Sequence, residues 1–335
     1  MLNYVKKILI FSISMFIWKG RIMKKTYKRF NSYLLAISIT AAVGLIFALF
    51  SLLFYYNADL KSIEYKNVIP ILTVIIFAIA VVFAVVFTAQ TDTIHITKIK
   101  KNSSILKFAT LLSVALSVAL FLYDFIFFVI YPNESSPLKI ARLTVFLPFI
   151  AYLIIEVIPT RMHRRVFRIP TWLKVITSLS TIIWCVLGLL AMYFWSALAT
   201  TNIFKLHHMF YYVLAVLFFM FEIKFELISH KGHRGYMLSA LVLFSYTFIS
   251  TGAIIIVKFA GGLVGVNISN FEMFLPLAIG LYALSKMIAI KNTINFVMKR
   301  DLQSVRSHSH RSHKHNNSTH HHDDADEVTV VENKD

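Results

Sequence analysis

Residues 69–89 read IPILTVIIFAIAVVFAVVFTA, which is twenty-one consecutive residues without a charged side chain. At about 1.5 Å of rise per residue, a helix of this length crosses the roughly 30 Å of hydrocarbon in a bilayer. Lipid offers no hydrogen-bond partner to backbone amides, and the stretch does not alternate as a barrel strand would. It therefore predicts a transmembrane helix and identifies the bilayer as the solvent of this part of the chain.

The composition extends this conclusion to the whole chain of 335 residues. Hydrophobic residues make up 58% and charged residues 15%, against roughly 25% charged in soluble domains, and the mean hydropathy is +0.69. Ordinary soluble enzymes, disordered chains and, with Cys185 as the single cysteine, disulfide-stapled modules are excluded. We predict an all-α integral membrane protein, a bundle of about eight transmembrane helices at 34–56, 69–89, 106–130, 142–158, 174–198, 207–228, 237–257 and 271–290.

The bundle is flanked by two segments of different character. Residues 1–33 form a basic N-terminal segment, residues 34–290 the eight-helix domain, and residues 291–335 a tail that is predicted to be disordered. The apolar run within residues 1–22 is too short to span a bilayer. Two interpretations of it stay open: it lies flat at the inner interface, or translation starts at Met23 and residues 1–22 are a start-site artefact.

Basic residues predict the orientation. Of the 34 Lys and Arg residues, twenty-five lie in alternate segments that include both termini, and six lie in the other four loops. Because cytoplasmic loops carry the excess of Lys and Arg, both termini are predicted to be cytoplasmic. This placement explains the net charge of +18 better than nucleic-acid binding does. The Ile-, Phe-, Lys- and Asn-rich composition is typical of AT-rich bacterial genomes, so the expected location is a bacterial cell membrane.

Two similar triplets suggest an internal duplication. Phe146-Leu147-Pro148 and Phe274-Leu275-Pro276 are placed at similar depth in the fourth and eighth predicted spans. A four-plus-four repeat would be parallel, as in some transporters. The alternative is that unrelated apolar helices look alike by composition, since the first and fifth spans share only two identities in 25 aligned positions. Both prolines are expected to bend their helices.

The sixth predicted span carries a polar face. At 100° per residue, His208, Tyr211, Ala215, Glu222, Glu226 and Ser229 fall within about 60° of one another, and Lys224 points to the opposite side. Ionisable groups in hydrocarbon are costly, so they should face protein, water or an ion. Glu222 and Glu226 could serve a proton or cation relay. The structural alternative is that Glu226 reaches the headgroups and Glu222 pairs with Lys286 of the eighth span.

The third predicted span shows a similar face. Thr110, Ser113, Ser117 and Asp124 fall on one side, which could coordinate a hard cation or bond to a neighbouring helix. Asp124 lies about two turns from the outer boundary, and Lys205, His207 and His208 are its candidate partners. A further acid, Glu156, is expected to pair with Arg161 or another basic residue at the interface.

The tail is rich in histidine and ends in an acidic run. Its seven imidazoles could bind a divalent metal weakly, although no cofactor is otherwise indicated. These metal candidates are His308, His310, His313, His315, His320, His321 and His322.

The best functional interpretation is a transporter or permease-like protein for a small solute or cation. The alternative is a non-transporting membrane sensor or an accessory subunit of a membrane complex. An integral-membrane enzyme is not expected, because no zinc-protease, nucleophile-elbow or histidine-box motif is present.

Overall fold

The structure is a computed structural model, and it describes only part of the chain. The described residues are 31–57, 62–63, 67–90, 104–131, 137–157, 161–162, 165–166, 170–194, 203–227, 233–260 and 273–293. All of them belong to one compact unit, Ile22–Asn295. The segment 1–30 and the histidine-rich tail lie outside the described residues.

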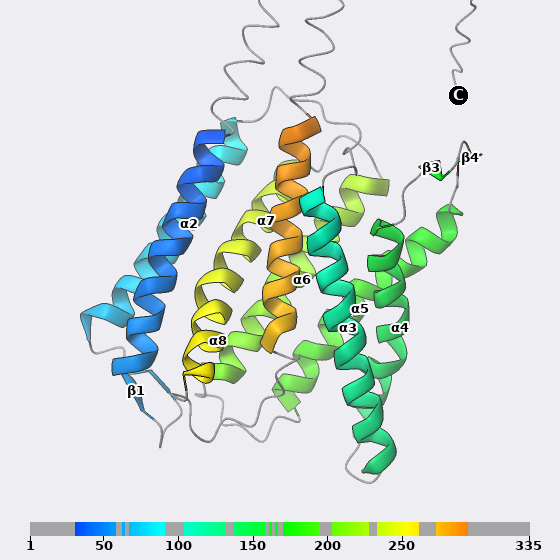
Figure 1. Ribbon diagram of the computed structural model, residues 1–335, viewed down its shortest axis with the longest axis horizontal. Helices are drawn as coiled ribbons and strands as arrows, with labels where there is room; N and C mark the ends of the chain where they lie inside the picture. The colour runs from blue at the N-terminus through cyan, green and yellow to red at the C-terminus, as the bar shows by residue number, and fades with distance from the viewer. Residues whose placement is uncertain are drawn as a thin grey trace, which may run out of the picture. The chain divides into compact units, whose positions relative to one another are not determined.

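Within the described residues, eight helices are long and apolar enough to cross a membrane, in agreement with the predicted number of spans. Their ends agree with the predicted windows to within a few residues, and the largest difference is at the start of α4. The helices are Asn31–Phe54, α2 (Val68–Gln90), α3 (Ser104–Ile130), α4 (Pro137–Val157), α5 (Thr171–Phe194), α6 (Ile203–Leu227), the composite span Arg234–Phe259, and Met273–Thr293 (Figure 1). The composite span joins α7 (His233–Tyr246), η2 (Thr247–Thr251) and α8 (Gly252–Phe259).

Short antiparallel ladders occur in two of the connections. Strand β1 (Tyr56–Asn57) pairs with β2 (Ser62–Ile63), and β3 (Arg161–Met162) pairs with β4 (Arg165–Val166). Each strand has only two residues, so the fold remains all-helical, as predicted.

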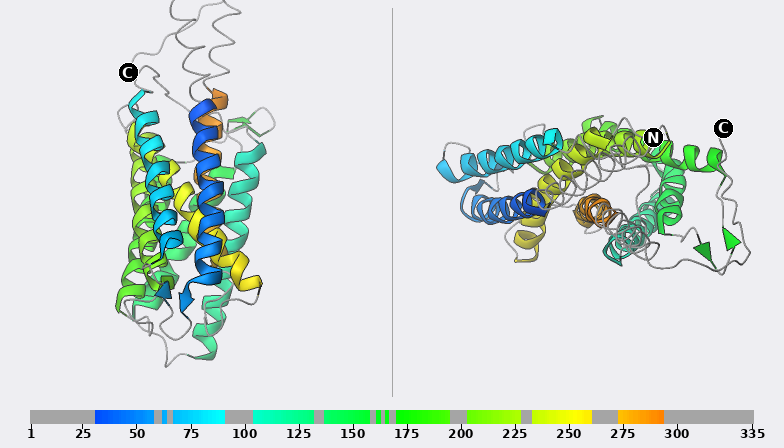
Figure 2. Two further views of the ribbon diagram at one scale, coloured as in Figure 1. Left: turned by 90° about the vertical axis from the view of Figure 1, so that its left-hand side faces the viewer. Right: turned by 90° about the horizontal axis from the view of Figure 1, so that it is seen from above.

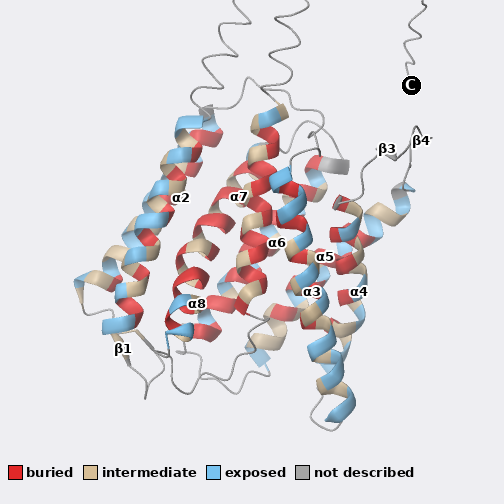
Figure 3. Ribbon diagram, viewed as in Figure 1, coloured by how far each residue is buried: buried red, intermediate tan, exposed pale blue. Residues whose placement is uncertain are grey.

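The spans differ in how much of each is covered by protein. In the composite span and in Met273–Thr293, 67% and 72% of the most apolar window is buried, against 17% in α2 and in α3. Figure 3 shows this contrast between the central and the peripheral helices. Along the chain, α3 packs on α4, α4 on α5, α5 on α6 and α6 on α7, while α2 packs on α7. Seen from above in Figure 2, α2 therefore lies at the side of the unit next to α7, with the helix Asn31–Phe54 beside it.

The two prolines of the similar triplets occupy different positions. Pro148 lies inside α4, eleven residues after its start, where it removes a backbone hydrogen bond. Pro276 is the fourth residue of Met273–Thr293. Residues 261–272, just before this helix, lie outside the described residues, so the bend expected at Pro276 stays a prediction.

The π-helical turn η2 lies where three spans approach closely. Its Ile249 side chain reaches the helix Asn31–Phe54, where a Cβ added at Gly44 would lie 2.7 Å from Ile249 Cδ1. On the opposite flank, a Cβ at Gly280 would overlap Thr247 Oγ1. Small residues at such contacts let membrane helices approach closely enough for dispersion forces to hold them.

We predict that Gly280→Ala lowers the free energy of unfolding by about 1–3 kcal/mol, because the new methyl group overlaps Thr247 and the helices must separate. Thermal unfolding of the purified protein in detergent measures this loss. Gly252→Ala is the control, since its methyl group would meet only the flexible end of Leu45 at 3.1 Å. Adding Thr247→Ala should restore part of the loss, and an unchanged melting temperature in Gly280→Ala would contradict the close approach.

Candidate functional site

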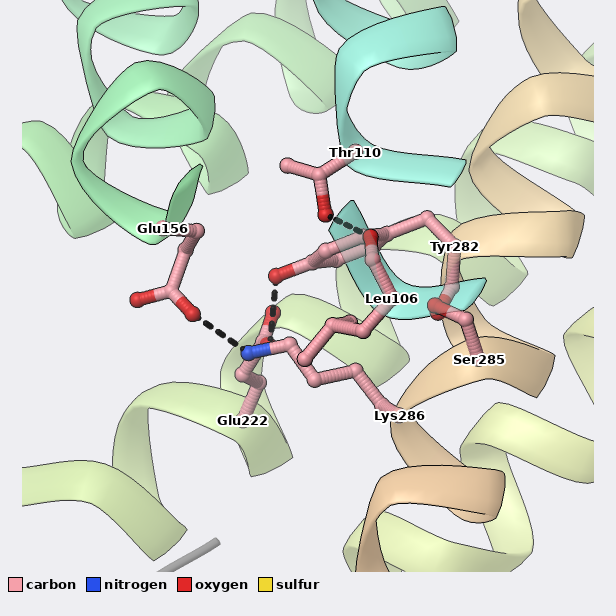
Figure 4. Close-up of polar contacts among 7 residues, drawn as sticks. All are labelled: Leu106, Thr110, Glu156, Glu222, Tyr282, Ser285 and Lys286. Carbon is pink, nitrogen blue, oxygen red and sulfur yellow. Dashed lines mark hydrogen bonds and ion pairs between the residues drawn. The ribbon is translucent and has the colours of Figure 1, made fainter. Parts of the chain in front are cut away.

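One lysine lies between two carboxylates in the interior of the bundle. The ammonium of Lys286 donates to Glu156 Oε2 at 2.6 Å and lies 2.9 Å from Glu222 Oε1. All three side chains are at most 1% exposed. Figure 4 shows the lysine reaching from the span Met273–Thr293 toward acids on α4 and α6. We call Glu156, Glu222 and Lys286 the triad.

A tyrosine completes the polar group. The hydroxyl of Tyr282 donates to Glu222 Oε1 at 2.9 Å, and its ring centroid lies 5.2 Å from the ammonium of Lys286. Residues four apart share a helix face, so Tyr282 and Lys286 point to the same side of their span. Glu222 Oε1 thus accepts the hydrogen bond of Tyr282 and forms the ion pair with Lys286 (Figure 4).

The helix positions explain how these side chains meet. Glu156, Glu222 and Lys286 each lie within about two turns of the C-terminal end of their own helix. The three helices finish at the same end of the bundle, which is uppermost in Figure 1. An isolated charge at that depth would cost several kcal/mol, so each charged group is stable only because the opposite charge is supplied by another helix.

The formal charge of the triad decides its chemistry. With both carboxylates ionised, the two negative charges face one positive charge, and the triad carries a charge of −1. A proton or a monovalent cation bound by either carboxylate would make it neutral. Because the lysine contacts both acids, it can stay paired with one of them while the other is neutralised. The arrangement can therefore bind a cation and change which helices are held together.

The polar face predicted on α6 points into the protein. His208, Tyr211, Ala215 and Glu222 are all buried, with exposed fractions of 0–3%. Lys224 is exposed, as the helical wheel predicts. The predicted pairing of Glu222 with Lys286 is confirmed. The side chain of Glu226, and Ser229, lie outside the described residues.

The hydroxyl face of α3 is buried too. Thr110, Ser113 and Ser117 are at most 1% exposed. Ser113 donates to the carbonyl of Ala278 in the last span at 3.1 Å, so it serves as a contact between helices. Ser117 Oγ is buried without a hydrogen-bond partner among the described residues.

Asp124 lies at the opposite end of the bundle from the triad. It lines a pocket of about 220 Å³ together with Lys139 and Arg142 of α4. These basic residues belong to the helix because α4 begins at Pro137, five residues before the predicted boundary. Of the expected partners of Asp124, His207 bonds Tyr246 and Thr251, and His208 bonds the carbonyl of Phe204. Lys205 donates to the carbonyl of Tyr193 at 3.4 Å, and its pairing with Asp124 stays a prediction.

Arg142 is a buried residue that the sequence did not single out. Its guanidinium lies 4.9 Å from the ring of Trp184 and 5.5 Å from the ring of Tyr212, and it donates to the Tyr212 hydroxyl at 2.7 Å. Aromatic faces attract a desolvated cation, which is why an arginine is tolerated here. The accumulation of aromatic residues on α5 and α6 is visible in the sequence, but their approach to Arg142 is not.

Sequence reasoning also missed the role of Glu156. Its expected partner at the membrane interface was Arg161 or another basic residue, and the structure instead pairs it with the buried Lys286. Within the described residues, no group of three or more His, Cys, Asp or Glu side chains could hold a metal ion. The seven histidines of the tail lie outside those residues, so metal binding by the tail stays a prediction.

Comparison with known proteins does not identify a relative. No protein family, no curated protein and no solved structure matches this chain.

We predict that the triad tolerates loss of one acid better than loss of the lysine. Lys286→Met leaves two buried carboxylates facing each other and should cost about 3–5 kcal/mol of unfolding free energy, whereas Glu222→Gln leaves a neutral Lys286–Glu156 pair and should cost less. Thermal unfolding in detergent gives the order. Lys224→Met, an exposed lysine on α6, should cause no comparable loss. If Lys286→Met has the same melting temperature as the wild-type protein, the ion pairs do not stabilise the bundle.

Proposed function

We propose that this multi-pass membrane protein is a cation-coupled transporter of a small solute, and that the triad binds the coupling cation. The observation that carries the proposal is the sharing of one buried lysine by two carboxylates from two other helices. Buried ionisable groups in membrane helices commonly mark ion pathways and proton relays.

The triad offers a direct link between cation binding and helix movement. In the unloaded state, Lys286 ties its own span to α4 through Glu156 and to α6 through Glu222. A proton or cation on Glu222 removes the attraction to α6 and leaves the attraction to α4. The change biases α6 to move relative to α4 and the last span. A ligand can shift a conformational equilibrium only through such a difference in interaction between the two states.

Glu222 is the better placed of the two acids to receive the cation. Its contact with Lys286, at 2.9 Å, is longer than that of Glu156, at 2.6 Å, so neutralising Glu222 gives up the weaker of the two ion pairs. Tyr282 can keep its hydrogen bond to the carboxyl group when Glu222 is protonated. Glu156 then acts as the fixed counter-charge of the lysine.

A second candidate function is a non-transporting sensor or accessory subunit of a membrane complex. The observation that favours it is the low burial of α2 and α3, each with 17% of its most apolar window buried. Such faces can contact a partner helix as well as lipid. In that case the triad would only stabilise the bundle, and its neutralisation would leave any output of the complex unchanged.

We propose that the protein lies in a bacterial cell membrane with both termini in the cytoplasm. An even number of spans places the two ends of the helical unit on the same side. The excess of Lys and Arg in the terminal and alternate segments favours the cytoplasmic side. The triad would then lie near the cytoplasmic ends of its helices, and Asp124 near the outer face.

We predict a cation-dependent charge displacement in proteoliposomes. A proton or Na⁺ concentration jump over the wild-type protein on a solid-supported membrane should give a transient current, since the cation enters a low-dielectric site. Glu222→Gln and Glu156→Gln should reduce this current about tenfold or more, equivalent to a loss of 1.4 kcal/mol in cation affinity.

Lys224→Gln is the matched control, because it changes a charge on the same helix that is exposed. It should keep the current. Equal amounts of folded protein are verified by size-exclusion chromatography and thermal unfolding. A wild-type current that survives in folded Glu222→Gln, or no current with either cation, would contradict the proposal and favour the accessory-subunit function.

The orientation is tested by fusions. Green fluorescent protein after residue 335 should fluoresce, because it folds on the cytoplasmic side, and alkaline phosphatase after residue 265 should be active, because that loop is predicted to be outside. An active phosphatase fused at the C-terminus would reverse the assignment.

A further inference from the structure

A cavity of about 570 Å³ lies at the end of the bundle opposite the triad. It is formed by the helix Asn31–Phe54, by α2 and α6, and by the composite span around η2. Along α6, its residue His207 precedes Glu222 by fifteen residues, which is about 22 Å of helix rise. The cavity is therefore separate from the candidate cation site, and the argument below does not depend on the proposed function.

The volume and lining of the cavity are those of a ligand site. Pockets for small molecules are typically about 300–1,000 Å³, mostly apolar, with a few convergent polar groups. Here Tyr246 contributes an aromatic wall, with its ring 5.6 Å from Phe77 and 4.7 Å from Phe210. Ala48 and Ala253 keep the interior open because their side chains are small.

The cavity opens on the outer surface of the helix bundle. Val74, Leu206 and Phe210 line the cavity and are 54%, 52% and 46% exposed. All three belong to membrane-spanning helices. In a bilayer these exposed faces would contact lipid, so a molecule from the bilayer could enter the cavity sideways.

Three polar residues of the cavity lie near helix ends, whereas Tyr246 and Ser250 lie well inside the composite span. Ser51 precedes the end of its helix by three residues, and Thr73 follows the start of α2 by five. Their hydroxyl oxygens are 3.1 Å apart. His207 follows the start of its span by three residues, and its ring nitrogens lie 2.9 Å from Tyr246 Oη and from Thr251 Oγ1.

The apolar part extends further toward the middle of the bilayer. Phe77 lies nine residues into α2, which is about 13 Å of rise. Ile249, in the π-helical turn, is part of the same wall. Single π-helical turns are often found at functional sites, because the extra residue displaces the side chains around it. The cavity thus combines an apolar wall at Phe77 and Ile249 with a few polar residues, three of which lie near helix ends.

We propose that this cavity binds one acyl chain of a membrane phospholipid. The hydroxyl groups of Ser51 and Thr73 donate to the carbonyls of Phe47 and Ile69 in their own helices, so the contacts that the cavity offers to the chain are apolar. The aromatic wall around Tyr246 packs against the chain. The lipid fills the space between α2 and η2 and links the helix pair at the side of the unit to its centre.

The test is photo-crosslinking in nanodiscs with a phosphatidylcholine whose acyl chain carries a diazirine. Labelled peptides should come from α2 and η2, at cavity residues such as Phe77 and Ile249. Ala48→Phe and Ala253→Phe each fill the cavity and should reduce this labelling about tenfold. Ala42→Phe is the matched control, because Ala42 lies on the exposed face of the same helix as Ala48, and it should keep the labelling.

Three results would overturn the proposal. The first is labelling of the cavity peptides that is unchanged in folded Ala48→Phe and Ala253→Phe, which is the behaviour of ordinary surrounding lipid. The second is wild-type labelling spread over the exposed residues of all spans. This second result decides the case even if both filled variants fail to fold. The third is cavity labelling by a diazirine fatty acid but not by the phospholipid probe, which would assign the site to free fatty acids.

Discussion

Hydrocarbon cannot form hydrogen bonds, and this constraint shapes both the backbone and the side chains of the spans. Helices satisfy the backbone amides internally. Hydroxyl side chains follow the same rule, since Ser38, Thr110 and Ser245 each donate to the carbonyl four residues earlier in their own helix. A charged side chain has no such local solution and needs a partner from another helix, as Lys286 finds in Glu156 and Glu222.

The triad is therefore both a structural and a chemical feature. Its ion pairs link three spans at one end of the bundle, and the proposed function relies on its unequal numbers of acids and bases. A buried pair of one acid and one base would have only one ion pair to form. Two acids on one lysine instead give two pairings with similar contacts, at 2.6 Å and 2.9 Å.

The other end of the bundle is stabilised differently. Arg142 is held by the rings of Trp184 and Tyr212, and His207 bonds two hydroxyl groups around the π-helical turn. Here polar groups are satisfied by aromatic and hydroxyl neighbours. Small residues such as Ala48 and Ala253 leave a cavity beside them. The composite span connects this cavity to the tightly packed centre, where Gly280 meets Thr247.

The sequence by itself determined the helices and their number, because uncharged runs such as 69–89 can only be helical in a bilayer. It also placed Glu222 on a buried face and Lys224 on the exposed one, since the helical period is a local property. It indicated Lys286 as the partner of Glu222, because both lie at the same depth.

Only the tertiary structure decided which helices are neighbours, since packing between apolar helices leaves little trace in composition. For this reason Glu156 was assigned to a basic residue at the interface, whereas the structure pairs it with Lys286. The cavity beside η2 was equally invisible, because it depends on the distances between four helices that are far apart in the chain.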